Sequence, residues 1–261
     1  MSTVANNTAF APAAPHMKLA YRLIGPRLYI RYRAWRAMRQ ARDGHEGELK
    51  LLAFIVPRGR MAIDVGANRG NYSFYLSRLA PRTVAYEVSP VMARFLKEAR
   101  LPGVEVREVG LSDRKGRLTY CARRNAKGRP MYNSAFLSDE TPDGDFAILQ
   151  PVNVVRLDNE GHDDVGFIKI DVEGHEYQVI EGARELLARC RPTLLVEILE
   201  GRGDREAVAR NATVRLLNSL GYEAYIFARG ALQPLCDAPL GPDTMNYIFL
   251  PRNAAVRENA R

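Results

Sequence analysis

The sequence predicts a doubly wound α/β domain with a mostly parallel, seven-stranded sheet and helices on both faces. Short apolar runs rich in β-branched and aromatic residues alternate with segments of helical periodicity, and the first run enters a glycine turn. Strands buried on both faces have such nearly continuous apolar sequences. The expected strands are residues 60–66, 83–88, 104–111, 166–172, 193–199, 222–228 and 245–251, and the helices are residues 71–80, 90–99, 174–189 and 204–220.

A basic segment precedes this domain. Residues 1–16 have the composition of a disordered leader, and every charged residue from Met17 to Arg42 is Lys or Arg. Gly25-Pro26 is expected to break this segment into two helices, because proline disrupts a helix interior. The expected division is a leader and basic helical extension (1–45), the α/β domain (46–251, with a helix at 46–54) and a C-terminal tail (252–261).

The net charge of +8 resides in the N-terminal part, because residues 1–60 hold eleven Lys or Arg and three Asp or Glu, and the remainder is balanced. Between residues 17 and 42 the cations alternate with aromatic and aliphatic side chains. This pattern fits a helical cap with a solvated basic face, or peripheral contact with the inner membrane surface or an anionic glycolipid. Nucleic acid is not an expected partner.

Residues 113–150 interrupt the alternation of strands and helices. They are rich in Gly, Pro, Asn and Asp, with a hairpin expected around residues 118–122. Such insertions commonly form part of a substrate pocket. Residues 114–129 carry seven positive charges and no acid, which favours anionic acceptors.

Composition restricts the compartment. No run approaches the roughly 20 apolar residues that span a bilayer, and the N-terminus lacks the features of a secretory signal. The three scattered cysteines form no close pair, which is typical of a reducing compartment. We therefore expect a cytoplasmic protein, with its oligomeric state left open.

The first strand leads into a loop suited to a nucleoside ligand. Asp64-Val65-Gly66-Ala67-Asn68-Arg69-Gly70 has glycines that permit a tight turn and close approach of a ligand to the backbone. The following helix offers free N–H groups, and Tyr72 and Ser73 lie in its first turn. The spacing is neither G-x-G-x-x-G nor a P-loop, which favours a nucleoside without pyrophosphate.

Acidic residues at later strand ends extend this site. Glu87 ends the second strand, where a carboxylate can accept both ribose hydroxyls. Ser112-Asp113 ends the third strand and is placed to hold an adenine amino group. An adenosyl group carrying an amino acid fits this set.

Four motifs resemble the FkbM family of methyltransferases: DVGANRGNYS (64–73), YEVSP (86–90), FIKIDVEGHE (167–176) and PTLLVEI (192–198). The resemblance implies a class I, Rossmann-like methyltransferase fold, S-adenosylmethionine as cofactor, and O-methylation of sugars or other secondary-metabolite hydroxyls. It places Asp64, Gly66, Asn68, Gly70, Tyr72, Ser73 and Glu87 along the cofactor, and Asp171, Glu173 and Glu176 on the acceptor side. Val88 departs from the family's usual proline.

The end of the fourth strand is the expected catalytic region. Asp171 is interpreted as general base or acceptor anchor, or alternatively as the partner of the cofactor's ammonium group. His175 is a second candidate base, because its ordinary pKa suits neutral pH. Lys169 lies mid-strand and is expected to pair with Glu197 or Asp64. We expect no metal, and a solvated His162.

Three functional classes stay open. The main interpretation is an O-methyltransferase acting on a sugar, glycan, glycolipid or secondary-metabolite hydroxyl. The alternatives are a nucleic-acid or protein methyltransferase and a non-catalytic S-adenosylmethionine-binding module. Bases are often N-methylated by enzymes with an Asn/Asp-Pro-Pro-aromatic motif after the fourth strand, and here IDVEGHE (170–176) stands there.

Overall fold

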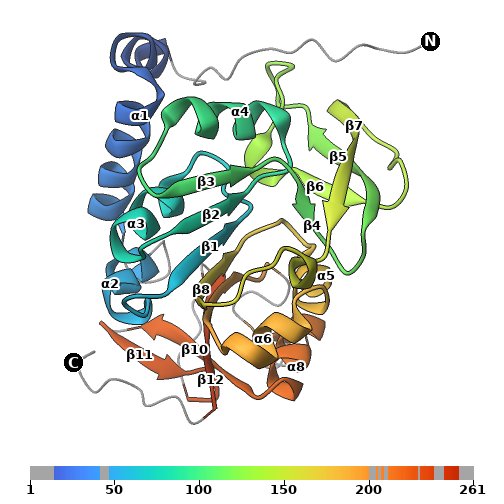
Figure 1. Cartoon of the computed structure of the whole chain (residues 1–261). Coiled ribbons are helices and arrows are strands. Elements are labelled where there is room, and N and C mark those ends of the chain that lie inside the picture. The colour runs from blue at the N-terminus through green and yellow to red at the C-terminus, as the bar shows by residue number, and fades with distance from the viewer. Residues whose placement is uncertain are drawn as a thin grey trace.

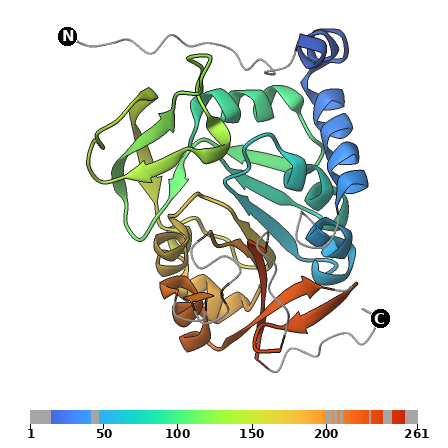
Figure 2. The same cartoon turned by 180° about the vertical axis from the view of Figure 1, so that it is seen from behind.

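The computed structural model describes residues 15–41, 47–199, 204, 207–208, 211–228, 230–237 and 244–252. Most of the predicted leader and C-terminal tail lies outside these residues. The molecule is built on one large twisted sheet with helices on both faces and a small second sheet beside it (Figures 1 and 2).

The large sheet is mixed and has eight strands in the order β11-β10-β12-β9-β8-β1-β2-β3. The five strands from β3 to β9 are parallel, and β12, β10 and β11 continue the sheet antiparallel. The strands are β1 Met61–Val65, β2 Thr83–Tyr86, β3 Val104–Arg107, β8 Val165–Ile170, β9 Thr193–Glu197, β10 Tyr222–Ala228, β11 Ala231–Pro234 and β12 Asn246–Pro251.

The prediction of seven strands was wrong, because the sheet has an eighth strand, β11, at its edge. This strand is only four residues long and ends at Pro234, so its sequence lacks an apolar run. It forms because it pairs antiparallel with β10. The strand order reverses at β1, which lies between β2 and β8, and ligands of such sheets bind at the carboxyl ends of the strands beside this switch point.

Alternating side chains of the strands divide the core between two helical layers. Ala62 and Phe167 point toward one layer, and Ile63 and Ile168 point toward the other. The first layer holds α1 Pro15–Gln40, η1 Gly47–Leu51, α2 Leu52–Ile55, α3 Asn71–Leu79 and α4 Pro90–Ala99. The second holds α5 Glu176–Glu181, α6 Arg184–Cys190 and α8 Ala212–Ser219, with η3 Leu157–Asn159 beside it.

The basic N-terminal segment forms α1, which packs on α3 and α4 (Figure 1). The predicted break is confirmed, because Gly25 has a φ of 72° that interrupts the helix before Pro26. Tyr29, Ile30 and Ala34 are buried against the domain. In the described segments, no helix combines the length and apolar character required to cross a membrane.

The insertion forms a four-stranded sheet in the order β4-β7-β5-β6. Its strands are β4 Gly110–Leu111, β5 Gly116–Arg123, β6 Phe136–Ser138 and β7 Phe146–Val155, with η2 Tyr132–Ser134 between β5 and β6. The single third strand predicted at 104–111 is therefore split, because β3 belongs to the large sheet and β4 to the small one. The predicted hairpin region is β5, which pairs antiparallel with both β6 and β7.

The helix predicted at 174–189 is also two helices, α5 and α6. Gly182 separates them at a point of close backbone approach, since a Cβ there would lie 1.9 Å from the carbonyl oxygen of Ser112. This contact fixes the second helical layer against the start of the insertion.

Gly182→Ala is therefore expected to lower the free energy of unfolding by about 1–3 kcal/mol, because the added methyl group meets backbone that cannot rotate away. Urea unfolding measures the change. Gly116→Ala is the matched control, because no atom lies within 4 Å of its added Cβ. Equal midpoints for the two variants would contradict the assigned contact.

Candidate active site

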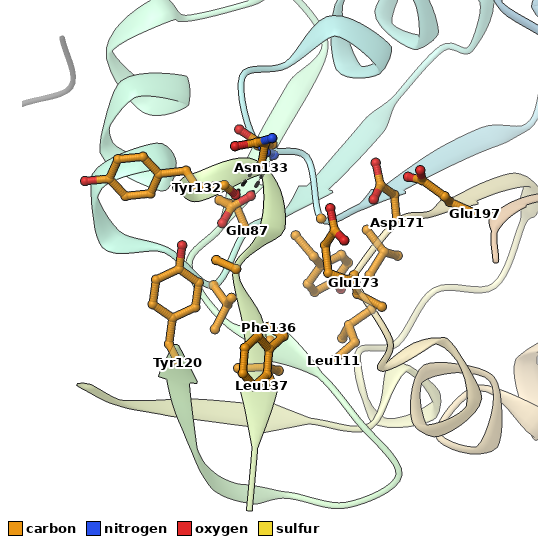
Figure 3. Close-up of a pocket in the computed structure, with 18 of the residues that line it drawn as sticks. Glu87, Leu111, Tyr120, Tyr132, Asn133, Phe136, Leu137, Asp171, Glu173 and Glu197 are labelled. Carbon is orange, nitrogen blue, oxygen red and sulfur yellow. Dashed lines mark hydrogen bonds between the residues drawn. The ribbon is translucent and has the colours of Figure 1, made fainter. Parts of the chain in front are cut away.

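A cavity of about 230 Å³ opens at the carboxyl ends of β1, β2 and β8, below the small sheet. Acidic side chains of the large sheet face it from two ends, and aromatic and aliphatic side chains of the insertion close one side (Figure 3). The acidic residues are Glu87, Asp171, Glu173 and Glu197, and the insertion contributes Tyr120, Tyr132, Asn133, Ala135, Phe136 and Leu137.

Glu87 marks the first end of the cavity, directly after β2. Its Oε2 accepts from the backbone N–H of Asn68 at 2.6 Å, and its Oε1 accepts from that of Ser89 at 2.8 Å. Burial raises the pKa of Glu87 to about 7, against the opposing effect of these two donors. The carboxylate is thus held rigidly at the strand end, in position to accept from a ligand.

Asn68 supplies a second polar group at this end. Its φ of 47° turns the glycine loop so that its N–H points at Glu87. Its side-chain nitrogen donates to the carbonyl oxygen of Tyr132 at 3.3 Å. Its Oδ1 is buried and has no hydrogen-bond partner in the described structure, so it can receive a donor from a ligand.

Asp171, Glu173 and Glu197 mark the other end, after β8 and β9 (Figure 3). Burial and the neighbouring Asp171 raise the pKa of Glu197 to about 9, so Glu197 holds a proton and donates its hydrogen bond to Asp171. Burial, with Asp171 and Glu176 nearby, raises the pKa of Glu173 to about 7. Three carboxyl groups thus share this end with different proton affinities.

Lys169 lies near these carboxyl groups, and its charge lowers the pKa of each of them. It is almost fully buried, and its Nζ contacts Asp171 Oδ2 at 2.5 Å and lies 4.7 Å from the centroid of the Tyr72 ring. The expectation that Lys169 pairs with a carboxylate is confirmed, but the partner is Asp171 and not Glu197 or Asp64. Asp171 follows on the same face of the strand and reaches the ammonium directly, while the other two carboxyl groups act on it at longer range.

The pKa values of this pair move in the stabilising direction. Burial raises the pKa of Asp171, but the Lys169 ammonium and the hydrogen bond from Glu197 together outweigh burial and lower this pKa below its usual range. Burial likewise lowers the pKa of Lys169, and Asp171, Asp64 and Glu197 outweigh it and raise that pKa. Both groups therefore stay charged at neutral pH.

Gly66 lets the glycine loop after β1 contact the acidic loop after β8. Its φ is 75°, and a Cβ at this position would lie 1.9 Å from the carbonyl oxygen of Asp171. Only glycine fits both the left-handed conformation and the space. The glycine loop and the acidic loop after β8 are therefore in backbone contact.

The structure divides the predicted cofactor residues into two groups. Gly66, Asn68 and Glu87 line the cavity. The others support the loop from behind: Ser73 Oγ donates to Asp64 Oδ2 at 2.5 Å, and both side chains are buried. Tyr72 packs under Lys169. Ala67 and Gly70 are buried beside α1 and α4, and neither lines the cavity.

Of the predicted residues on the acceptor side, Asp171 and Glu173 line the cavity. His175 does not line it, and burial lowers its pKa. Its Nε2 lies 3.0 Å from Oγ of Ser112, which with Asp113 was expected to hold the adenine amino group of the cofactor, and neither Ser112 nor Asp113 lines the cavity. Asp113 accepts from Ser112 Oγ at 3.1 Å, and Glu176 accepts from the backbone N–H of Gly174 at 3.0 Å.

His162 was expected to be solvated, and this prediction was wrong. It is 3% exposed, with Nε2 2.7 Å from the hydroxyl oxygen of Tyr86. The hydroxyl of Tyr86 also donates to Glu160 at 3.0 Å. The turn that follows η3 folds onto the end of β2, and sequence spacing gives no sign of this.

Sequence reasoning missed the individual residues of the cavity wall: Tyr120, Tyr132, Asn133, Phe136 and Leu137. The insertion was predicted to contribute to a pocket, and the density of aromatic residues within it was the available signal. Tyr120 lies on β5 and Phe136 and Leu137 lie on β6, and their register depends on the pairing of β5 with β7 and with β6, which local sequence does not determine.

Comparisons with known proteins identify the family of the chain. The chain matches the sequence profile of the methyltransferase FkbM domain over residues 64–224. It is 27% identical over 185 residues to methyltransferase sdnD of Sordaria araneosa, a match covering 59% of this chain and 71% of that protein.

Two solved structures show weaker similarity. Methyltransferase FkbM from Methylobacillus flagellatus has a TM-score of 0.45 and 14% identity over 74% of this chain and 43% of that chain, so this protein spans less than half of it. SMU.1697c from Streptococcus mutans, solved in complex with SAH, has a TM-score of 0.43 and 13% identity over 80% of this chain and 98% of that chain.

The profile match and the strand order of the large sheet define a class I, Rossmann-like methyltransferase fold, with S-adenosylmethionine as cofactor. Because the matched residues make up more than half of the chain, the protein belongs to the FkbM methyltransferase family. The resemblance stated from the four sequence motifs is thereby confirmed.

Lys169→Met is expected to destabilise the protein by about 3–5 kcal/mol near pH 8, because it leaves buried carboxylates without their cation. Wild-type Asp171, with its lowered pKa, stabilises the fold above the pKa of the unfolded chain and loses this effect as pH falls. Without Lys169, the buried carboxyl groups of the folded variant have higher pKa values and take up protons more readily. The loss of stability relative to the wild type therefore becomes smaller as pH falls. Urea unfolding at several pH values tests this, with Lys115→Met as the exposed control.

The affinity for S-adenosylhomocysteine is expected to rise between about pH 6 and about pH 8, because Glu87, with a pKa of about 7, accepts ribose hydroxyls best when ionised. Glu87→Gln should bind about tenfold more weakly at pH 8 and lose the rise. Calorimetric titration measures both, and Glu98→Gln on the exposed side of α4 is the control. A pH-independent wild type would argue against ribose contact at Glu87.

Proposed function

We propose that the protein transfers the methyl group of S-adenosylmethionine to a hydroxyl oxygen of a sugar, glycan, glycolipid or secondary metabolite. One observation carries the proposal: a single cavity has the buried carboxyl group of Glu87 at one end and a cluster of carboxyl groups with unequal proton affinities at the other. A hydroxyl acceptor needs such a base, because it must lose its proton when the new bond forms.

The donor end fits S-adenosylmethionine. Glu87 and the unpartnered Oδ1 of Asn68 are acceptors for ribose hydroxyls or an adenine amino group. Gly66 packs against the backbone of Asp171 and places no side chain between the glycine loop and a bound ligand. When bound, S-adenosylmethionine supplies an electrophilic methyl group.

At the acceptor end, we assign the general base to Glu173. Its carboxyl group lines the cavity, and a pKa of about 7 lets it take a proton from the acceptor hydroxyl near neutral pH. Asp171 stays ionised beside Lys169 and is better suited to anchor the acceptor or an ammonium group. Glu197 keeps its proton and fixes Asp171 through the hydrogen bond between them.

The cavity wall favours a small or extended acceptor with apolar faces. Tyr120 and Phe136 lie across the cavity from Asp171 and Glu197, whereas the ring of Tyr132 points away from these carboxyl groups (Figure 3). Carbon-bound hydrogens on sugar rings and hydrocarbon skeletons pack well on such rings, while the hydroxyl groups reach Glu173.

The proposal places the enzyme in the cytoplasm. Its three cysteines are free thiols, two of them buried, and free thiols are typical of a reducing compartment.

Methyl transfer from labelled S-adenosylmethionine to a panel of sugars, glycosides and hydroxylated aglycones tests the function, with RNA and protein mixtures as competing acceptors. Label in an alkali-stable ether of a hydroxyl acceptor is the expected result. Label in RNA or protein alone would contradict the proposal. Binding of S-adenosylhomocysteine without transfer to any class would favour the non-catalytic module.

Glu173→Gln is expected to lower kcat at pH 7 by about a hundredfold or more, because the amide cannot accept the proton. The wild-type kcat should rise as pH increases through about 7, because Glu173 ionises in this range, and the variant should show no such rise. Affinity for S-adenosylhomocysteine should change little in both Glu173→Gln and the control Glu185→Gln on the surface of α6. If Glu173→Gln keeps the kcat of the wild type, Glu173 is not the general base.

A further inference from the structure

The outward face of α1 carries an apolar stripe. Leu28, Tyr32 and Trp35 follow one another at helical spacing and are 49%, 39% and 52% exposed. Leu23, just before the break at Gly25, is 76% exposed. The opposite face already packs on α3 and α4, so the stripe is not needed to hold the helix on the domain.

Arginines flank this stripe on both sides. Arg27 and Arg31 lie on one flank, Arg36 lies on the other, and Arg39 stacks over the Trp35 ring with its Cζ 5.0 Å from the centroid. The sequence of α1 contains no Asp or Glu. An apolar stripe with aromatic residues between cations is typical of helices that lie in the interface of an anionic bilayer.

A separate cavity of about 340 Å³ lies where α1 meets α3, remote from the donor site. Arg27, Arg31 and Arg78 line it together with Leu28, Phe74, Leu101 and Pro102. The guanidinium of Arg78 lies 3.5 Å from the centroid of the Phe74 ring and donates to the carbonyl oxygen of Phe74 at 2.6 Å.

These three arginines converge without a compensating acid. Among the described residues, none of the three forms an ion pair with a carboxylate. Burial and the nearby charges of Arg31 and Arg27 lower the pKa of Arg78, as expected for cations held close together. A phosphate group would neutralise them, since arginine guanidinium groups bind phosphate oxygens in pairs.

We propose that α1 docks the enzyme on the surface of an anionic phospholipid bilayer, with the stripe in the interface and a headgroup phosphate in the cavity of Arg27, Arg31 and Arg78. The exposed Leu23 and Leu28 favour a bilayer over a nucleic acid, because aliphatic side chains gain by leaving water and offer bases no stacking surface. Docking is independent of the methyl acceptor, and binding assays without substrate test it.

Sedimentation with vesicles tests the docking surface. The wild-type protein should sediment with phosphatidylcholine vesicles that contain phosphatidylglycerol and stay in solution with phosphatidylcholine alone. Arg27→Gln/Arg31→Gln and Leu28→Ser/Trp35→Ser should each lower partitioning by about tenfold or more, because the first removes charge and the second the apolar anchor. Arg117→Gln/Arg215→Gln removes two exposed charges outside α1 and should change partitioning less than about twofold.

Three outcomes would overturn the proposal: no wild-type binding to anionic vesicles, equal losses in the α1 variants and the control, or unchanged binding in Leu28→Ser/Trp35→Ser. A tRNA titration completes the test. Tight tRNA binding that depends on Arg27 and Arg31 but not on Leu28 and Trp35, together with absent vesicle binding, would assign the surface to nucleic acid instead. Because all four substituted side chains are exposed, circular dichroism should show unchanged thermal unfolding.

Discussion

The glycine loop after β1 and the acidic loop after β8 meet backbone to backbone, and the cavity depends on this contact. Gly66 has no side chain to separate them, and its left-handed conformation turns the chain toward Glu87. A side chain at this position would push apart the donor end and the acceptor end. The same contact lies at the switch point of the sheet, where the topology leaves space above the strand ends.

A buried cation makes the acidic loop tolerable. Asp171, Glu173, Glu197 and Asp64 would repel one another in a poorly solvated site, and Lys169 lies among them with its ammonium on Asp171. The Lys169 ammonium helps to keep Asp171 ionised. Burial and the charge of Asp171 keep Glu197 protonated, while the pKa of Glu173 lies near neutrality. Environment gives chemically similar side chains different roles.

Most of the large sheet could be predicted from the sequence, because its strands are buried on both faces and have an apolar pattern. Glu87 and Asp171 could be placed at strand ends for the same reason. The partner of Lys169 and the burial of His162 depend on side-chain packing across segments far apart in sequence, which periodicity does not report. The split of β3 from β4 and the position of Tyr120 on β5 depend on pairing with β7, a strand more than twenty residues away from both β4 and β5.

The cavity wall comes from one continuous stretch of chain, whereas the donor end comes from loops spread along the large sheet (Figure 1). Substitutions between β5 and β6 can reshape the cavity wall while Gly66 and Glu87 stay on the large sheet, and the contact of this segment with the donor loop is the bond from Asn68 to the backbone carbonyl of Tyr132. Relatives that share the donor loop can therefore diverge in substrate choice through this segment alone. An exchange of residues 116–138 between two such enzymes would carry acceptor preference with it and leave donor binding to the recipient scaffold.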